Sequence, residues 1–127
     1  MFKNLLFALC LFFFSCKEGS AQSSLNLTTS EFQELAKASN ATILDVRTLG
    51  EWNSGYIPKA IHMNFYEEKF QSQLEKIPKE NTVLVYCASG GRSSKTLQIL
   101  KEKGFSKAYH LRGGIRIWQE KGLPIVH

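Results

Sequence analysis

Residues 83–94 read VLVYCASGGRSS, and this stretch decides the fold class. The apolar run Val83–Tyr86 is typical of a strand that is buried on both faces of a parallel sheet. Gly90 and Gly91 then turn the chain, and the apolar spacing that follows predicts a helix over residues 93–103. Ligands bind at the carboxyl ends of strands in open α/β sheets, so we expect any functional site at this turn.

The rest of the chain alternates between strand and helix patterns. Runs of β-branched and apolar residues predict strands, and apolar residues three and four positions apart predict helices. Besides the central strand and its helix, we expect strands at residues 42–46, 60–63 and 107–111, and helices at residues 28–36, 49–53, 66–77 and 115–120. This alternation predicts an α/β fold of three layers, in which helices flank a mostly parallel central sheet on both faces.

The predicted helix at residues 66–77 depends on one apolar stripe. Tyr66, Phe70, Leu74 and Ile77 lie at positions i, i+4, i+8 and i+11, which places them on one face of a helix. We therefore expect these four side chains to pack together against the sheet.

The first 21 residues have the composition of an export signal. Lys3 precedes an apolar run at residues 5–14, and ten residues are too few for a membrane-spanning helix, which needs about 20. Two routes of processing stay open. Acylation of Cys16 is favoured, because Ser15-Cys16 after an apolar run resembles a bacterial lipoprotein box. Cleavage after Ala21 is the alternative. We expect an exported domain at residues 27–127, either periplasmic or anchored to a membrane of the cell envelope through lipid on Cys16.

Export leaves Cys87 as the thiol to be explained. Cys10 leaves with the signal and Cys16 is lipidated or removed, so Cys87 has no partner for an intramolecular disulfide. The chain has no C-x-x-C pair and no Cys/His cluster at metal-ligand spacing, which argues against a metal site. The net charge of +5 is scattered without a basic run, and we therefore predict no nucleic-acid partner.

The loop after Cys87 combines a nucleophile with groups that bind anions. Adjacent glycines let successive N–H groups converge, and the following helix adds the positive end of its dipole. We expect these groups and Arg92 to favour the thiolate. The predicted site therefore has Cys87 as its catalytic residue, and its substrate-binding residues are Ala88, Ser89, Gly90, Gly91, Arg92 and Ser93. In the alternative, the glycines only turn the chain and Arg92 is a solvated helix start.

Between Leu27 and Leu123 the sequence resembles the single-domain type of the rhodanese homology domain. The resemblance is carried by three ordered motifs: ILDVR at residues 43–47 with EW at 51–52 and GYIPKAI at 55–61, YCASGGRS at residues 86–93, and LRGG at residues 111–114 with Trp118. The first motif departs from the family at Tyr56, where many relatives carry His.

The resemblance implies a sulfurtransferase. Cys87 would take a sulfane sulfur from a small anionic donor, hold it as a persulfide and pass it to a thiol or to cyanide. No cofactor is implied. Thiosulfate, a polysulfide and a mercapto acid all stay open as donors, and the sequence assigns no oligomeric state.

Residues outside the loop are expected to be structural. We interpret Asp45, Arg47 and Glu51 as an ion-pair group that joins the end of a strand to a short helix, in preference to the alternative of direct contact with the substrate. Trp118 is expected to pack in the core, where an aromatic ring contributes a large buried area. His62 and His110 receive no role from the sequence.

Loop length separates two enzymatic interpretations. Cysteine phosphatases of related folds carry five residues between Cys and Arg, whereas this loop has four. No Asp lies nearby in sequence as a general acid for a leaving alkoxide. Sulfur transfer is therefore favoured over a phosphatase or an arsenate reductase. A non-catalytic binding domain or a sulfur carrier is a third alternative.

Overall fold

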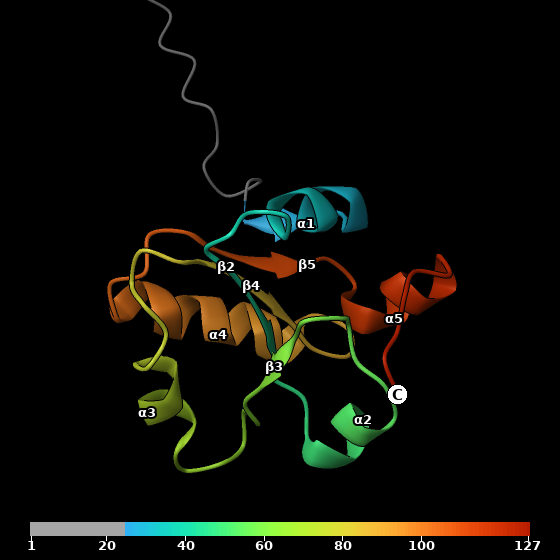
Figure 1. The fold of residues 1–127 in the computed structure, drawn as a ribbon. Helices are drawn as coiled ribbons and strands as arrows, with labels where there is room; N and C mark the ends of the chain where they lie inside the picture. Colours follow the sequence, from blue (N-terminus) through green and yellow to red (C-terminus); the bar gives the residue numbers. More distant parts are fainter. Residues whose placement is uncertain (1–24) are drawn as a thin grey trace, which may run out of the picture.

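The computed structural model describes residues 25–127, which fold around a single parallel sheet. The strands are β1 (Asn26–Leu27), β2 (Ala41–Asp45), β3 (Ile61–His62), β4 (Thr82–Tyr86) and β5 (Ala108–Leu111). The helices are α1 (Thr29–Leu35), α2 (Leu49–Asn53), α3 (Phe70–Leu74), α4 (Gly91–Glu102) and α5 (Gly114–Glu120). The strand order is β1-β5-β4-β2-β3, and each neighbouring pair is parallel. This confirms the predicted α/β class, with β4 in the centre (Figure 1).

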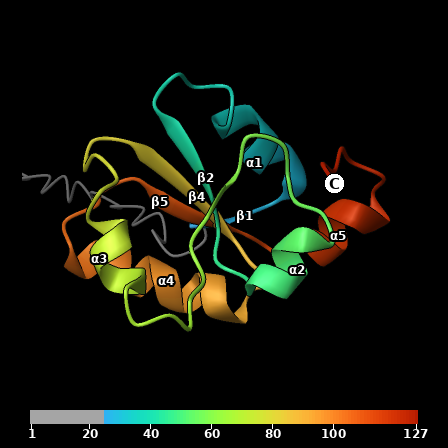
Figure 2. The ribbon, with the colours of Figure 1, turned by 60° about the horizontal axis from the view of Figure 1, so that its bottom comes forward.

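Two apolar clusters fill the two faces of the sheet. On one face Leu84 and Tyr86 of β4 pack with Phe32 of α1 and Trp118 of α5. On the other face Val83, Val85 and Cys87 pack with residues of α3 and α4. This alternation follows from the two-residue period of a strand. Figure 2 shows the helices on the two faces, which completes the three predicted layers.

Most of the predicted elements lie within two residues of their expected bounds, but residues 66–77 do not. The side chain of Asn64 accepts a hydrogen bond from the N–H of Tyr66, and its carbonyl accepts one from the N–H of Glu67. This turn replaces the first part of the expected helix, because a local side-chain acceptor competes with helical hydrogen bonds. Phe70 and Leu74 are buried as predicted, but Tyr66 is 68% exposed, so its assignment to the apolar stripe was wrong.

Strand β1 was not anticipated. Its two residues are too few for a periodic pattern, and they join the sheet by pairing with His110 and Leu111 of β5. The predictions of an export signal and of lipidation at Cys16 fall outside the described residues. Within residues 25–127, none of the helices is long and apolar enough to cross a membrane.

Candidate active site

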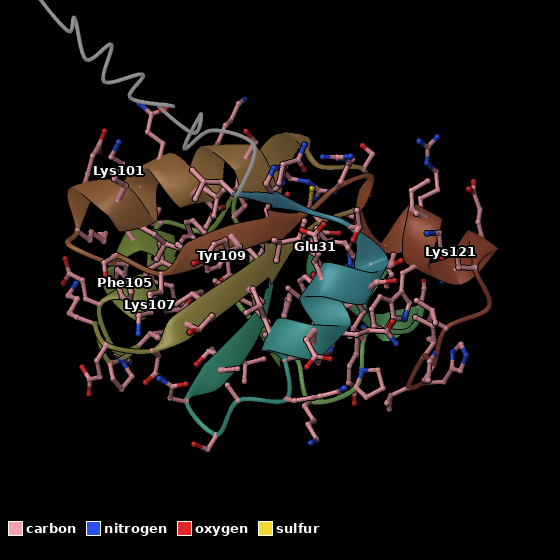
Figure 3. All side chains as sticks on the ribbon, turned by 90° about the horizontal axis from the view of Figure 1, so that it is seen from above. Glu31, Lys101, Phe105, Lys107, Tyr109 and Lys121 are labelled. Atoms are coloured by element: carbon pink, nitrogen blue, oxygen red, sulfur yellow. The ribbon has the colours of Figure 1, made fainter. Side chains whose placement is uncertain are left out.

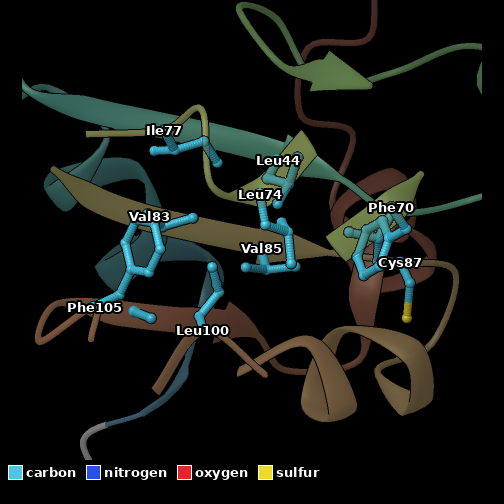
Figure 4. Close-up of a cluster of buried hydrophobic side chains, with 11 residues drawn as sticks. Leu44, Phe70, Leu74, Ile77, Val83, Val85, Cys87, Leu100 and Phe105 are labelled. Atoms are coloured by element: carbon cyan, nitrogen blue, oxygen red, sulfur yellow. The ribbon is translucent and has the colours of Figure 1, made fainter. Parts of the chain in front are cut away.

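Cys87 directly follows the central strand, on the face that α4 covers. It continues the inward row of Val83 and Val85 along β4, and Figure 4 shows its sulfur pointing towards the start of α4. The residue is only 1% exposed. Strand β4 and its flanking helices therefore hold the thiol in a fixed position at the carboxyl edge of the sheet.

The loop after Cys87 presents hydrogen-bond donors to the sulfur. The N–H of Gly90 lies 3.1 Å from Sγ and the N–H of Ser93 lies 3.5 Å from it. Gly90 reaches this geometry with φ at +116°, in a region that side-chain-bearing residues rarely adopt. The second predicted glycine, Gly91, begins α4. The turn that brings these N–H groups together thus requires glycine at position 90.

These donors oppose the effect of burial on the thiol. Burial by itself raises the pKa of Cys87, because a charged sulfur loses solvation. The hydrogen bond with the Ser93 side chain lowers it, as do the backbone N–H groups of Ser93, Gly90 and Ser89, and the net result is a lowered pKa. The thiolate, which is the nucleophilic form of cysteine, is therefore favoured relative to an ordinary cysteine.

Ser93 connects the sulfur to the neighbouring strand. Its Oγ lies 3.5 Å from Cys87 Sγ and 3.0 Å from Nδ1 of His110. His110 is on β5 and pairs in register with Val85 of β4. The sequence assigned no role to His110, because only the pairing of β4 with β5 brings it to the loop.

Arg92 forms a forked ion pair with Glu51. Nη1 and Nη2 donate to the two carboxylate oxygens at 2.7 and 2.9 Å. These hydrogen bonds lower the pKa of Glu51 to about 2 and raise that of Arg92. Thr48 and Glu51 also form a reciprocal capping box that begins α2. The guanidinium thus lies between α4 and α2, paired with a carboxylate rather than directed at the sulfur.

This pairing changes the role that the sequence suggested for Glu51. Asp45 and Arg47 do form a buried ion pair, with 2.7 Å between Arg47 Nη2 and Asp45 Oδ2. The same Nη2 donates to the carbonyl of Gly55, so the pair ties the end of β2 to the segment after α2. Glu51 is not part of this group. Its carboxylate instead pairs with Arg92, 41 positions away, which local sequence reasoning could not find.

Helix α5 supports the loop that begins at Cys87. The N–H groups of Ile115 and Arg116, in its first turn, donate to the carbonyls of Cys87 and Ala88 at 2.9 and 3.2 Å. Gly114 lies so close to the backbone of this loop that a Cβ on it would be 2.4 Å from the carbonyl oxygen of Ala88. In the sequence this glycine pair is recognised only as part of the LRGG motif at residues 111–114. The structure shows that the start of α5 is packed against the backbone of the loop.

Two aromatic groups outside the loop have packing roles in the structure. The ring of Tyr56, where many relatives carry His, stacks on Trp52 with centroids 3.7 Å apart, and Trp52 in turn lies 5.0 Å from the ring of His62. Nε2 of His62 lies 2.7 Å from the carbonyl oxygen of Arg47. Trp118 is buried and donates from Nε1 to the carbonyl of Pro124. In residues 25–127, no three His, Cys, Asp or Glu side chains gather in a way that could hold a metal ion.

The three sequence motifs converge at one edge of the sheet. Asp45 ends β2, Cys87 follows β4, and Gly113 and Gly114 follow β5. Because all these strands are parallel, their carboxyl ends lie side by side. A model of the rhodanese-like domain matches residues 28–121. The chain belongs to the rhodanese-like family.

Relatives of this rhodanese-like chain include named sulfurtransferases. A sulfurtransferase of Allochromatium vinosum is 36% identical over 94 residues, covering 74% of this chain and 86% of the relative. The thiosulfate sulfurtransferase GlpE of Coxiella burnetii is 38% identical over 89 residues, covering 70% and 81%. Among solved structures, a rhodanese-related protein of Thermoplasma volcanium has a TM-score of 0.71 at 28% identity, covering 80% of this chain and 96% of that one.

Proposed function

We propose that this rhodanese-like protein is a sulfurtransferase that carries sulfur on Cys87, with a thiosulfate-like anion as donor. The proposal is carried by the position of the sulfur: it is buried, it follows the central strand, and it accepts hydrogen bonds from the N–H groups of Gly90 and Ser93. The names of the similar sulfurtransferases support the reaction class. Sulfur transfer needs a thiolate that hydrogen-bond donors stabilise, and the N–H groups of this loop are such donors.

The proposed reaction proceeds in two displacements. The Cys87 thiolate attacks the sulfane sulfur of thiosulfate, a new S–S bond forms, and sulfite leaves with the electron pair of the broken bond. Cyanide or a thiolate then attacks the outer sulfur of the persulfide, and the Cys87 thiolate leaves with the pair that bound it. The donor supplies the oxidised sulfur, so no separate oxidant is needed. Each step places negative charge on sulfur near the same N–H donors, which stabilise it.

Intact mass is the direct test. Incubation with excess thiosulfate should add the mass of one sulfur atom, and cyanide should then remove it as thiocyanate. The same preparation should be offered an aryl phosphate and arsenate. If no sulfane donor loads the protein but the aryl phosphate is hydrolysed in a Cys87-dependent way, the phosphatase alternative is correct and sulfur transfer is excluded. A protein that loads sulfur but releases it to no small acceptor would be a sulfur carrier.

Arg92 is proposed to bind the anionic donor, which would replace the Glu51 carboxylate as the partner of the guanidinium. Because its fork is paired with Glu51, donor binding must weaken that pair, or use the outward side of the guanidinium. We expect Arg92→Ala to reduce the rate of sulfur loading about ten- to a hundredfold, the effect of losing a charged hydrogen-bond donor. Lys at this position should restore only part of the rate, since it lacks the planar fork.

Glu51→Gln is the matched control for Arg92. It removes the competing charge but keeps the side-chain size, so donor affinity should stay the same or improve while the Arg92→Ala defect remains. Kinetics of sulfite release at several thiosulfate concentrations measure both effects. If Arg92→Ala takes up sulfur at the wild-type rate, Arg92 does not bind the donor and only links α4 to α2 through its ion pair with Glu51.

We also propose export of the protein to the cell envelope, with a lipid anchor on Cys16. The support is the charged start, the short apolar run and Ser15-Cys16 in the sequence. The protein should fractionate with membranes and carry acyl chains, and Cys16→Ser should release it or stop its processing. The N-terminal residue and the mass of the expressed protein distinguish lipidation at Cys16 from cleavage after Ala21. A soluble protein that begins at Gln22 would contradict lipidation and indicate simple secretion.

A further inference from the structure

His110 is a titratable side chain beside the Cys87 loop, and the proposed reaction does not use it. It lies on β5, next to β4, and its Nδ1 is 3.0 Å from Ser93 Oγ. Ser93 is fully buried, and its Oγ is in turn 3.5 Å from Cys87 Sγ. A continuous chain of hydrogen-bonding atoms therefore runs from the imidazole to the sulfur, and bulk water has no access to its middle member.

The chain has one hydroxyl proton and three neighbours that can accept it. Ser93 Oγ lies 3.1 Å from the carbonyl oxygen of Gly90, and it also contacts Nδ1 of His110 and Sγ of Cys87. The Gly90 carbonyl already accepts the N–H of Ser94 at 3.0 Å. The protonation of Nδ1 therefore decides whether His110 competes with the sulfur for the hydroxyl proton. A bare Nδ1 attracts the hydroxyl proton away from the sulfur, whereas an Nδ1–H donates to Oγ and leaves that proton for the thiolate.

We propose that His110 is a positioning residue for Cys87. The Nδ1–H of His110 donates to Ser93 Oγ, and this hydrogen bond directs the Ser93 hydroxyl proton to the sulfur of Cys87. This inference rests on the proposed function for the identity of Cys87 as the sulfur carrier. The same arrangement serves the thiolate and the persulfide, because both bear negative charge near the Ser93 hydroxyl. When Cys87 is a neutral thiol, its S–H can donate to Oγ and the chain runs in the opposite direction.

The surroundings favour the neutral form of His110. Burial lowers the pKa of His110, and the positive charge of Arg112, which directly follows β5, lowers it further. Ser93 faces it from α4, and Lys101 lies along the same groove. The carbonyl of Leu25, the residue before β1, accepts its backbone N–H. No carboxylate is among these neighbours in the described part of the chain. A neutral imidazole has a single N–H, which can sit on Nδ1 or on Nε2.

A groove beside His110 gives its ring a second environment. The groove has a volume of about 860 Å³ and lies between β5 and α4, with Leu97, Lys101 and Tyr109 among its lining residues. Figure 3 shows β5 and α4 side by side, with Lys101 and Tyr109 labelled. The imidazole thus lies between buried Ser93 and a hollow that solvent can enter, so a proton can exchange at the ring while Ser93 stays buried.

Amide side chains test which ring nitrogen matters. In a comparable rotamer, the amide of Asn occupies the place of Nδ1, and that of Gln the place of Nε2. The quantity to measure is the pH midpoint of Cys87 alkylation by iodoacetamide in the full-length protein. His110→Ala and His110→Gln should raise this midpoint by about half to one pH unit, since one hydrogen bond in the chain is lost. His110→Asn should stay close to the wild type.

Variants of Ser93 distinguish the proposed role of His110 from a purely structural one. Ser93→Ala should raise the midpoint by itself, and adding His110→Ala to it should cause no further change, because the two residues act as one unit. Tyr109→Phe, at the adjacent position on β5, should have the wild-type midpoint. Far-UV circular dichroism of each variant verifies that it is folded, and the polar Asn and Gln variants serve if His110→Ala is not.

The inference is overturned if His110→Ala keeps the wild-type midpoint, if its effect is the same with and without the Ser93 hydroxyl, or if Asn and Gln behave alike. Alkylation requires no sulfur donor. A changed midpoint in a protein that takes up no sulfur would therefore uphold His110 and reject the proposed function. Normal sulfur loading with an unchanged midpoint in His110→Ala would uphold the proposed function and reject the role of His110.

Discussion

Cys87→Ser should take up no sulfur from thiosulfate and release no thiocyanate with cyanide. Cys87 is the free cysteine of the described residues, and a serine hydroxyl is far too weak a nucleophile to replace a thiolate held among N–H donors. We expect a loss of at least about a thousandfold in transfer rate, as is usual when a covalent nucleophile is removed. Steady-state thiocyanate formation and intact mass are the two measurements.

The fold should survive this substitution. Cys87 is buried in the cluster with Val85 and Phe70, but Ser is nearly isosteric with it and keeps an oxygen within reach of the same N–H groups. A Cys87→Ala variant separates the loss of the thiol from any new hydrogen bond made by Ser. Both variants should unfold close to the wild-type temperature. Residual sulfur loading in either of them would mean that another residue carries the sulfur.

Gly114→Ala should both destabilise the domain and impair the active site. With φ at +64°, the glycine already has a conformation that is strained for alanine, and the new Cβ would lie within 2.5 Å of the carbonyl groups of Cys87 and Ala88. The loop would have to move away from the first turn of α5, which now donates hydrogen bonds to both carbonyls. We expect a loss of about 3 kcal/mol or more in the free energy of unfolding.

Gly122→Ala is the matched control for this effect. Gly122 has almost the same backbone conformation, with φ at +66°, but a Cβ there meets nothing within 4 Å. It should therefore show only the conformational cost, about 1–2 kcal/mol, and leave sulfur loading unchanged. Thermal unfolding and the loading rate of both variants give the comparison. Equal destabilisation by the two substitutions, with normal loading by Gly114→Ala, would refute the idea that α5 supports the loop.

Local patterns in the sequence predicted the framework well. The apolar run Val83–Tyr86 indicated the central strand, because a strand that is buried on both faces carries apolar residues at successive positions. The loop with Cys87 and two glycines was also readable, because a nucleophile, a turn and a helix start are adjacent in the chain. The apolar stripe wrongly placed Tyr66 in a helix. Helical spacing does not take account of the Asn64 side chain, which accepts the N–H of Tyr66 and forms a turn there instead.

The sequence by itself determined the alternation of elements, the central strand and the position of the thiol, because periodicity and turn chemistry are properties of neighbouring residues. Only the tertiary structure decided the partners. It paired Glu51 with Arg92 instead of with Arg47, placed His110 against Ser93, and set Gly114 behind the carbonyls of the loop. The physical reason is the parallel sheet, which gathers the carboxyl ends of strands that are far apart in the chain. Which side chains meet there depends on register and packing, and no local pattern encodes either.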